Sequence, residues 1–119
     1  MTIRKIQEGE ELVIHTGPCG TPGSRQWIHV SDQASAVLFL LKSDFVNDVF
    51  HIAGERKSNQ QVAYGILRHS NKVSWPAVSE NAFDRFPGHD LHYALDDSKI
   101  RAAGWTPRLT FEQGLALTV

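Results

Sequence analysis

The chain has 119 residues, of which 41% are hydrophobic, and it carries 12 basic and 13 acidic side chains. This composition supports one folded domain, and the near-neutral charge argues against general binding to nucleic acids or anionic membranes. A single cysteine, Cys19, cannot form an internal disulfide. The longest apolar run, residues 36–41, is far shorter than the roughly 20 residues that span a bilayer, and the N-terminus is too charged for a signal peptide. We therefore expect a soluble cytoplasmic protein with no nucleic-acid or membrane partner.

The first third of the chain predicts short elements joined by a loop. Residues 3–8 favour a helix that ends at Gly9, and residues 12–15 favour a strand. Three glycines and two prolines lie within residues 16–24, so this segment is predicted to be a loop. Residues 27–30 are aromatic and β-branched and predict a second strand.

The clearest predicted helix spans residues 31–43. Ser31 or Asp32 is expected to cap its first turn, and apolar residues recur at helical spacing. Phe39 and Leu40 widen the apolar surface beyond a normal stripe. We therefore expect this helix to be covered on more than one side.

Further elements follow along the chain. Residues 49–52 predict a third strand, and Ser58 with Gln61 forms a capping box that opens a helix through His69. Residues 73–75 favour another short strand.

Two helices are predicted near the C-terminus. Asp96 or Asp97 is expected to cap a short helix that ends at Gly104, and residues 110–119 form a second helix behind a capping box. The alternation of strands and helices over residues 27–69 indicates a mixed α/β class with at least one crossover connection.

Residue chemistry alone gives no strong site. His89 and His92 flank a Pro-Gly turn, and no second pair has metal-ligand spacing, so no metal site is predicted. Cys19 lacks an evident base. Residues 17–23 could cradle a phosphate, but they lack the P-loop lysine and the G-x-G-x-x-G spacing, so a connecting loop is favoured. Arg25 could pair with a phosphate, although taken alone it is more simply a surface cation.

Three segments in a fixed order change this interpretation. They are residues 25–34 (RQWIHVSDQA), residues 49–59 (VFHIAG followed by SN) and residues 87–107 (PGHDLHYALDDSKI followed by GWTP). They resemble the Arg-Asp-Trp, Asn-Ile-Gly-Gly and Pro-Gly-His-Asp blocks of the sugar-nucleotide dehydratases and epimerases, which are extended short-chain dehydrogenases/reductases. The last block is most like that of the dTDP-glucose 4,6-dehydratases.

The resemblance implies a set of substrate-binding residues. The family's arginine before the tryptophan contacts the diphosphate of the sugar nucleotide and corresponds to Arg25. The asparagine that opens the later helix lines the nucleotide pocket and corresponds to Asn59. The loop that closes over the nucleotide corresponds to His89 and Asp90.

The chain departs from the family pattern at three places. Phe86 occupies the position of the family's arginine before the loop. Either Arg85, one residue earlier, substitutes for that arginine through a shifted backbone, or the phosphate contact is weakened. Gln26 replaces the usual aspartate, and residues 51–53 read His-Ile-Ala instead of Asn-Ile-Gly. The sugar, the base and the choice between epimerase and dehydratase therefore stay open.

Two family motifs are not found in their family setting. Gly17, Gly20 and Gly23 have the G-x-x-G-x-x-G spacing, but they lie in a predicted loop that leads to a strand and do not open a helix. There is no Tyr-x-x-x-Lys pair, since Tyr64 and Tyr93 are followed four residues later by Arg68 and Asp97. Hydride and proton transfer need these groups. We therefore expect residues 1–119 to be a single domain, the C-terminal substrate-binding part of an extended short-chain dehydrogenase/reductase fold without the N-terminal Rossmann portion. It should be mixed α/β, with a small sheet and about four to five helices.

The expected function is to bind a nucleotide-diphosphate sugar for an NAD(P)-dependent epimerase or dehydratase. This chain alone is expected to bind no cofactor and to be inactive. Its expected partners are the sugar nucleotide, the missing Rossmann portion and a second copy, because the apolar face over residues 37–41 would otherwise lack cover. The alternative is a non-catalytic binding or interaction module that kept the fold and lost the ligand.

Overall fold

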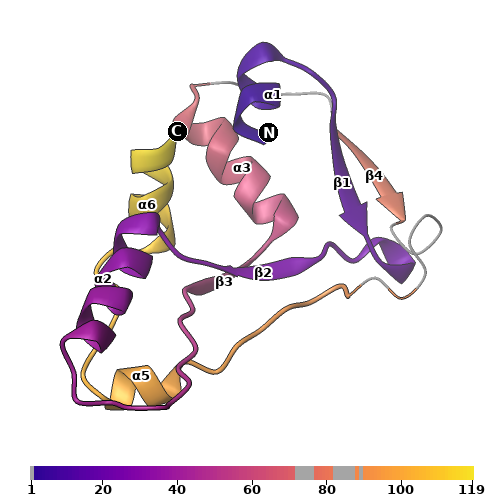
Figure 1. The fold of residues 1–119 in the computed structure, drawn as a ribbon. Coiled ribbons are helices and arrows are strands. Elements are labelled where there is room, and N and C mark those ends of the chain that lie inside the picture. The colour runs from indigo at the N-terminus through magenta and orange to yellow at the C-terminus, as the bar shows by residue number, and fades with distance from the viewer. Residues whose placement is uncertain (1, 72–76, 82–87, 89) are drawn as a thin grey trace.

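The computed structural model describes residues 2–71, 77–81, 88 and 90–119, and Figure 1 shows their arrangement. The elements are, in chain order, α1 (Thr2–Glu8), β1 (Leu12–Thr16), the 3₁₀ turn η1 (Pro18–Gly20), β2 (Ser24–Trp27), α2 (Val30–Leu41), β3 (Glu55–Ser58), α3 (Asn59–His69), β4 (Ala77–Asn81), α5 (Ser98–Ala102) and α6 (Phe111–Thr118). The predicted mixed α/β class with four to five helices is confirmed for the described residues. None of the described helices is long and apolar enough to cross a bilayer.

The described strands form two separate pairs rather than one small sheet. β1 and β4 run in parallel, with Leu12 opposite Ala77, and β2 and β3 run antiparallel, with Arg25 opposite Lys57. The crossover expected within residues 27–69 is therefore wrong for β2 and β3, because these strands run in opposite directions. The parallel pair is β1 with β4 instead.

The first core lies between α1, β1, α3 and α6. The predicted capping box is present at the start of α3, where Ser58 and Gln61 exchange side-chain and backbone hydrogen bonds. A Cβ on Gly65 of α3 would lie 2.5 Å from Leu115 Cδ2, so α3 and α6 approach closely. The buried residues of this core are Ile6, Leu12, Val62, Ala63 and Ile66.

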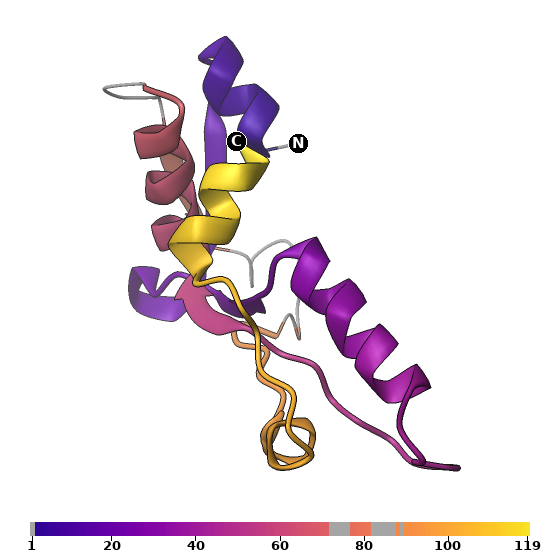
Figure 2. The same ribbon diagram turned by 90° about the vertical axis from the view of Figure 1, so that its left-hand side faces the viewer.

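The second core joins α2 and α5 to the segment that follows α5. Its buried members are Ala36, Ile100 and Trp105, which are 0%, 0% and 6% exposed. The indole Nε1 of Trp105 donates to Ser35 Oγ in α2 at 3.0 Å. Figure 2 shows α2 projecting away from the group formed by α1, α3 and α6.

Two cores make the described chain elongated. Its radius of gyration is 16.8 Å and its extents are 50 × 35 × 17 Å, whereas a compact domain of this length would have a radius of about 13.5 Å. The cores meet where the chain leaves β2 and enters β3. A Cβ on Gly54 would lie 1.9 Å from the carbonyl oxygen of Trp27, so the two backbones are in direct contact there.

The start of α2 differs from the prediction. The strand predicted at residues 27–30 is wrong in its bounds, because β2 ends where that strand should begin and α2 starts at its last residue. The cap of α2 is His29, whose Nδ1 accepts a bond from the Ser31 amide at 3.2 Å. Asp32 lies inside the first turn, where its buried carboxylate accepts a bond from the Leu109 amide at 3.0 Å.

The strand predicted at residues 49–52 is also wrong. Phe50 and Ile52 pack against the second core, but β2 finds its partner in the polar segment Glu55–Ser58. β-Prone side chains favour a strand only where a neighbouring backbone is available for pairing. The strand predicted at residues 73–75 lies outside the described residues.

The features predicted near the C-terminus are confirmed. Of the two candidate caps of α5, Asp96 supplies the side-chain bond, since its Oδ1 accepts from the Ser98 amide at 2.9 Å. Gly104 has a φ of +106° where the helix ends, and Thr110 begins the capping box of α6.

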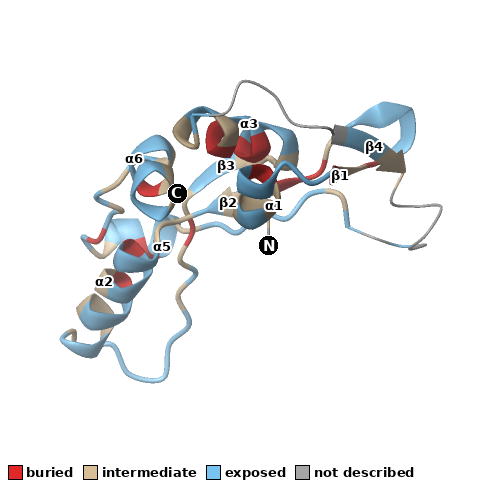
Figure 3. Cartoon of the chain, turned by 90° about the horizontal axis from the view of Figure 1, so that it is seen from above, coloured by how far each residue is buried: buried red, intermediate tan, exposed pale blue. Residues whose placement is uncertain are grey.

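One side of α2 has no cover within the described residues. Val37, Leu38 and Leu41 are 44%, 55% and 76% exposed, and Figure 3 shows α2 as largely exposed or intermediate. Phe39 and Leu40 pack against the second core. The expected uncovered face is therefore present, but it is narrower than predicted.

Candidate substrate-binding site

A segment that we call the strap, residues 90–95, lies along β2. The Ser24 amide donates to the Leu91 carbonyl at 3.0 Å, and the Tyr93 amide donates to the Ser24 carbonyl at 3.1 Å. Gln26 adds two bonds, because its Oε1 accepts from the Leu95 amide at 2.5 Å and its Nε2 donates to the Leu95 carbonyl at 3.1 Å. The strap is therefore held by Ser24 and Gln26 of β2.

Arg25 is fixed by the strap. Its Nη1 donates to the carbonyls of Ser24 and Leu91 at 2.7 and 2.9 Å, and its Nη2 donates to the Asp90 carbonyl at 3.2 Å. The guanidinium also lies over the Tyr93 ring, with Cζ 4.0 Å from the ring centroid. Three of its five N–H groups are thus used, and one on Nε and one on Nη2 remain. A cation held in this way can offer two donors to an anion without first losing its rotational freedom.

Asn59 lies beside the same part of β2. It is the first residue of α3, and its amide donates to the Gly23 carbonyl at 2.8 Å. A Cβ on Gly23 would lie 2.9 Å from the Leu91 carbonyl and 3.3 Å from Asn59 Nδ2. Only glycine leaves room here for both the strap and the start of α3.

The structure brings together three of the five residues that the sequence predicted. Arg25, Asn59 and Asp90 surround the Gly23–Ser24 backbone, and Asp90 contributes its carbonyl oxygen to the contact with Arg25. Arg85 and His89 lie outside the described residues.

Positive charge concentrates on the β2–β3 ribbon. Lys57 lies directly opposite Arg25 in the antiparallel register, so both side chains belong to the same face of the ribbon. Like charges at opposed positions are destabilising, and an anion bound between them relieves this repulsion. Within the described residues, Lys57 pairs with Glu55 at 3.0 Å, whereas Arg25 contacts carbonyl oxygens and no carboxylate.

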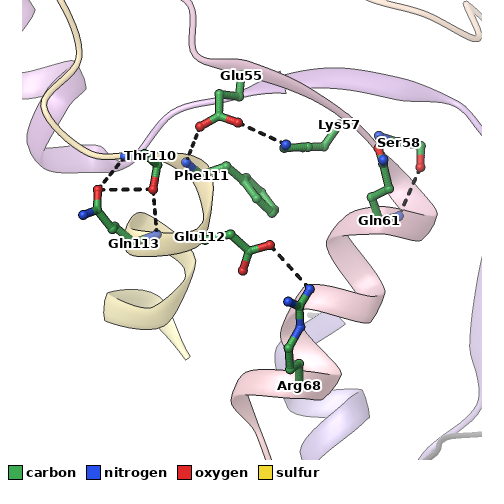
Figure 4. Close-up of polar contacts among 9 residues, drawn as sticks. All are labelled: Glu55, Lys57, Ser58, Gln61, Arg68, Thr110, Phe111, Glu112 and Gln113. Atoms are coloured by element: carbon green, nitrogen blue, oxygen red, sulfur yellow. Dashed lines mark hydrogen bonds and ion pairs between the residues drawn. The ribbon is translucent and has the colours of Figure 1, made fainter.

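Glu55 links this ribbon to α6 (Figure 4). Its Oε1 accepts a bond from the Phe111 amide at 2.7 Å, and its other oxygen pairs with Lys57. The Phe111 amide and then Lys57 hold the pKa of the Glu55 carboxyl below its ordinary value. A further ion pair, Arg68 with Glu112 at 3.5 Å, joins α3 to α6.

A pocket of about 790 Å³ opens beside the ribbon. It is lined mainly by apolar residues of α1, α3 and α6 and of the segments between β2 and α2 and before α6. None of the predicted substrate residues that the structure describes lines it. Trp27 does, and Trp27 shares a strand face with Arg25 because side chains alternate along a strand. The pocket therefore adjoins the face of the ribbon that carries Arg25, and Arg101 and Arg108 are the basic residues among its lining.

The glycine-rich loop does not offer a phosphate cradle. The Gly17 amide donates to the Thr21 carbonyl at 2.7 Å, and the Gly20 amide donates to the Gly17 carbonyl at 3.1 Å. These bonds use amides that a phosphate would need, so the connecting-loop interpretation is favoured. Within the described residues, no group of three or more His, Cys, Asp or Glu side chains could hold a metal.

Sequence reasoning missed several contacts of this site. Tyr93 stacks on Arg25, Lys57 faces it, and Ser24 Oγ bonds to His92 Nδ1 at 2.8 Å. Tyr93 belongs to the third family-like block, and that was the only available signal. Lys57 and Ser24 carried none, because their neighbours are set by strand pairing.

The comparisons with known proteins agree with this architecture. No model of a protein family matches the chain. The dTDP-glucose 4,6-dehydratase of Streptomyces niveus is 41% identical over 97 residues, which cover 80% of this chain and 28% of the relative. The crystal structure of dTDP-glucose 4,6-dehydratase from Bacillus anthracis in complex with NAD is 30% identical, with a TM-score of 0.78 over 98% of this chain and 36% of that one. The UDP-glucose 4-epimerase of Thermotoga maritima, solved with UDP-glucose, is 25% identical, with the same TM-score and the same coverage.

These similarities show to which class of proteins the chain is related. The chain is homologous to part of the nucleotide-sugar epimerases and dehydratases and has the corresponding part of their short-chain dehydrogenase/reductase-type fold. Within that class it is similar to the dTDP-glucose 4,6-dehydratases, at 41% and 30% identity to the two described above. The chain spans about a third of the length of these relatives.

Proposed function

We propose that this chain is the nucleotide-sugar-binding portion of an NAD(P)-dependent nucleotide-sugar dehydratase or epimerase. The observation that carries the proposal is the clamped guanidinium of Arg25, which keeps one N–H on Nε and one on Nη2 for an anion. The relatives are named for dTDP-glucose and UDP-glucose. Both are pyrimidine nucleoside diphosphate sugars, and a diphosphate calls for a permanent cation with paired donors.

The roles of the other residues follow from their places around Arg25. Lys57 adds a second positive charge on the same face, and Tyr93 holds the guanidinium plane. Asn59 offers a side-chain amide next to the strap, suited to a hydrogen bond with the nucleotide. Asp90 acts through its carbonyl oxygen, which orients Arg25. Arg85 and His89 complete the loop over the nucleotide, as the family resemblance implies.

We assign the hydride and proton chemistry to the portion of the relatives that this chain does not cover. On this proposal residues 1–119 are one substrate-binding domain, which is cytoplasmic, binds no NAD(P) by itself and is inactive alone. The coverage of 28% to 36% of the relatives supports this division. Gly17, Gly20 and Gly23 have the fingerprint spacing but lead into β2 instead of a cofactor-binding helix, and the sequence has no Tyr-x-x-x-Lys pair, which supports the division as well.

The proposal includes two protein partners. The exposed apolar side of α2 and the apolar pocket are surfaces that the Rossmann portion would cover. Without that portion, we expect the chain to self-associate through α2. Static light scattering at high micromolar concentration tests this expectation, and a monomer there would contradict it.

Ligand-induced stabilisation tests the binding function. Thermal unfolding is followed with dTDP-glucose and UDP-glucose for the parent chain, Arg25→Ala and the matched control Arg4→Ala, which removes an exposed arginine of α1. A ligand at about 100 times its Kd stabilises a protein by about 2.7 kcal/mol. We expect this stabilisation in the parent and in Arg4→Ala, and its loss in Arg25→Ala.

The opposite result would identify the alternative function. The exposed apolar side of α2 also suits an interaction module that has lost its ligand. If neither sugar nucleotide stabilises the parent chain, or if Arg25→Ala responds like Arg4→Ala, the nucleotide-sugar proposal is wrong and the interaction module is favoured.

A further inference from the structure

The face of the β2–β3 ribbon opposite Arg25 carries a second polar cluster. Side chains alternate along a strand, so Ser24 and Arg25 point to opposite faces. Arg56 lies opposite Gln26 and therefore shares the face of Ser24, and the parallel bridge between Ser24 and His92 adds the imidazole there. Arg56 Nε donates to Ser24 Oγ at 3.0 Å, and Ser24 Oγ lies 2.8 Å from His92 Nδ1.

The hydrogen-bond roles in this cluster follow from what each group can do. Arg56 Nε can only donate, so Ser24 Oγ accepts that bond. Ser24 is 7% exposed, and leaving its hydroxyl proton without an acceptor would be costly. We therefore assign the Ser24 hydroxyl as donor to His92 Nδ1. In the neutral imidazole the proton then resides on Nε2, on the far side of the ring from Ser24.

The outer edge of the cluster consists of donors. Both Nη groups of Arg56 and the Nε2–H of His92 have no acceptor among the described residues, and both side chains are exposed. No described carboxylate forms an ion pair with Arg56. Because Arg56 and His92 bond to the same buried oxygen, they are held close together in a fixed relation.

We propose that Arg56 and His92, joined by Ser24, form an oxyanion site for a phosphate group. A guanidinium with free Nη donors binds a phosphate through parallel hydrogen bonds, and the imidazole supplies a third donor from the side. The site lies on the opposite face of the ribbon from Arg25, so it is separate from the diphosphate contact.

A phosphate titration of the 119-residue chain tests the site. Inorganic phosphate is added at constant ionic strength, and the Arg56 Nε–H and the His92 imidazole are followed by nitrogen-edited NMR. We expect saturable shifts of both groups. In Arg56→Gln we expect affinity at least about tenfold weaker, because a bond to a charged group is lost. Arg4→Gln, the matched control at an exposed arginine of α1, should keep the parent affinity.

Two further arms make the test decisive. Thymidine monophosphate, titrated in the same way, distinguishes a phosphate monoester from the free ion, and the tighter ligand identifies the source. Arg56→Lys keeps the charge but cannot bond Ser24 and the anion together, so it should also bind weakly. If the NMR spectrum of Arg56→Gln shows that this variant is unfolded, Arg56→Lys takes its place in the test.

Three outcomes would overturn the proposal. They are the absence of a saturable shift, equal affinity in the Arg56 variants and the parent, and a shift that is kept in Arg56→Gln but lost in Arg25→Gln, titrated in the same way. The last result would place the phosphate at the diphosphate contact. Failure of the nucleotide-sugar proposal is recognised separately, because it concerns stabilisation by sugar nucleotides and its dependence on Arg25.

Discussion

Replacing Arg25 by lysine should release the strap while keeping the charge. Arg25 makes three hydrogen bonds to the carbonyls of residues 24, 90 and 91 and stacks on Tyr93. A lysine ammonium has three donors but no planar fork, so we expect it to keep one of these bonds. Two lost bonds at a partly exposed site amount to about 2 kcal/mol, which corresponds to a roughly 30-fold larger open population of the strap.

Amide hydrogen exchange measures this opening directly. The amides of Ser24 and Tyr93 bond across the β2–strap junction, so their protection reports whether the strap is attached. We expect protection of both amides to fall about 30-fold in Arg25→Lys, with the α3 amides unchanged. Arg101→Lys, a change in α5, is the control and should leave both amides protected. Parent-like protection of Ser24 and Tyr93 in a folded Arg25→Lys would refute the clamp.

Three other changes probe the cores and the ribbon. Ile100→Ala empties a fully buried position and should lower the free energy of unfolding by about 3 kcal/mol in urea titrations, because a cavity is left. Gly54→Ala should destabilise by at least about 1 kcal/mol in the same assay, since its Cβ would lie 1.9 Å from the Trp27 carbonyl oxygen; a neutral result would mean that the two backbones are not in contact. The pKa of Glu55 is lowered, chiefly by the Phe111 amide. The ionised Glu55 carboxylate therefore contributes to the free energy of unfolding above its ordinary pKa, and this contribution is lost as the pH falls through the lowered pKa. Urea titrations between roughly pH 3 and 6 should show this slope reduced in Glu55→Gln.

Local signals in the sequence predicted the helices well. The capping boxes at Ser58 and Thr110 bring together residues only three positions apart, so their geometry is encoded locally. The start of α2 was misplaced because histidine, here His29, is rarely counted among helix caps.

The strands were harder to predict because pairing depends on distant backbone. β2 and β3 are Ser-Arg-Gln-Trp and Glu-Arg-Lys-Ser, and the polar residues among these have little preference for strands. Residues 49–52 have that preference but pack with their side chains against the second core. Intrinsic propensity therefore pointed to the wrong segments.

The candidate site was predicted only as far as the family resemblance reached. Arg25, Asn59 and Asp90 came from aligned motifs, and the structure places them together. The bond between Ser24 and His92 joins residues 68 positions apart, which no local pattern reveals.

The backbone contact between Gly54 and Trp27 joins the two halves of the molecule. The segments that connect the two cores touch there main chain to main chain, with 1.9 Å available where a Cβ would be. No side chain can be introduced at position 54 without forcing the end of the ribbon apart, and that ribbon carries Arg25 two residues before Trp27. The close approach of these two segments, one of which continues from the strand that carries Arg25, therefore depends on a glycine that itself offers no side chain to a ligand.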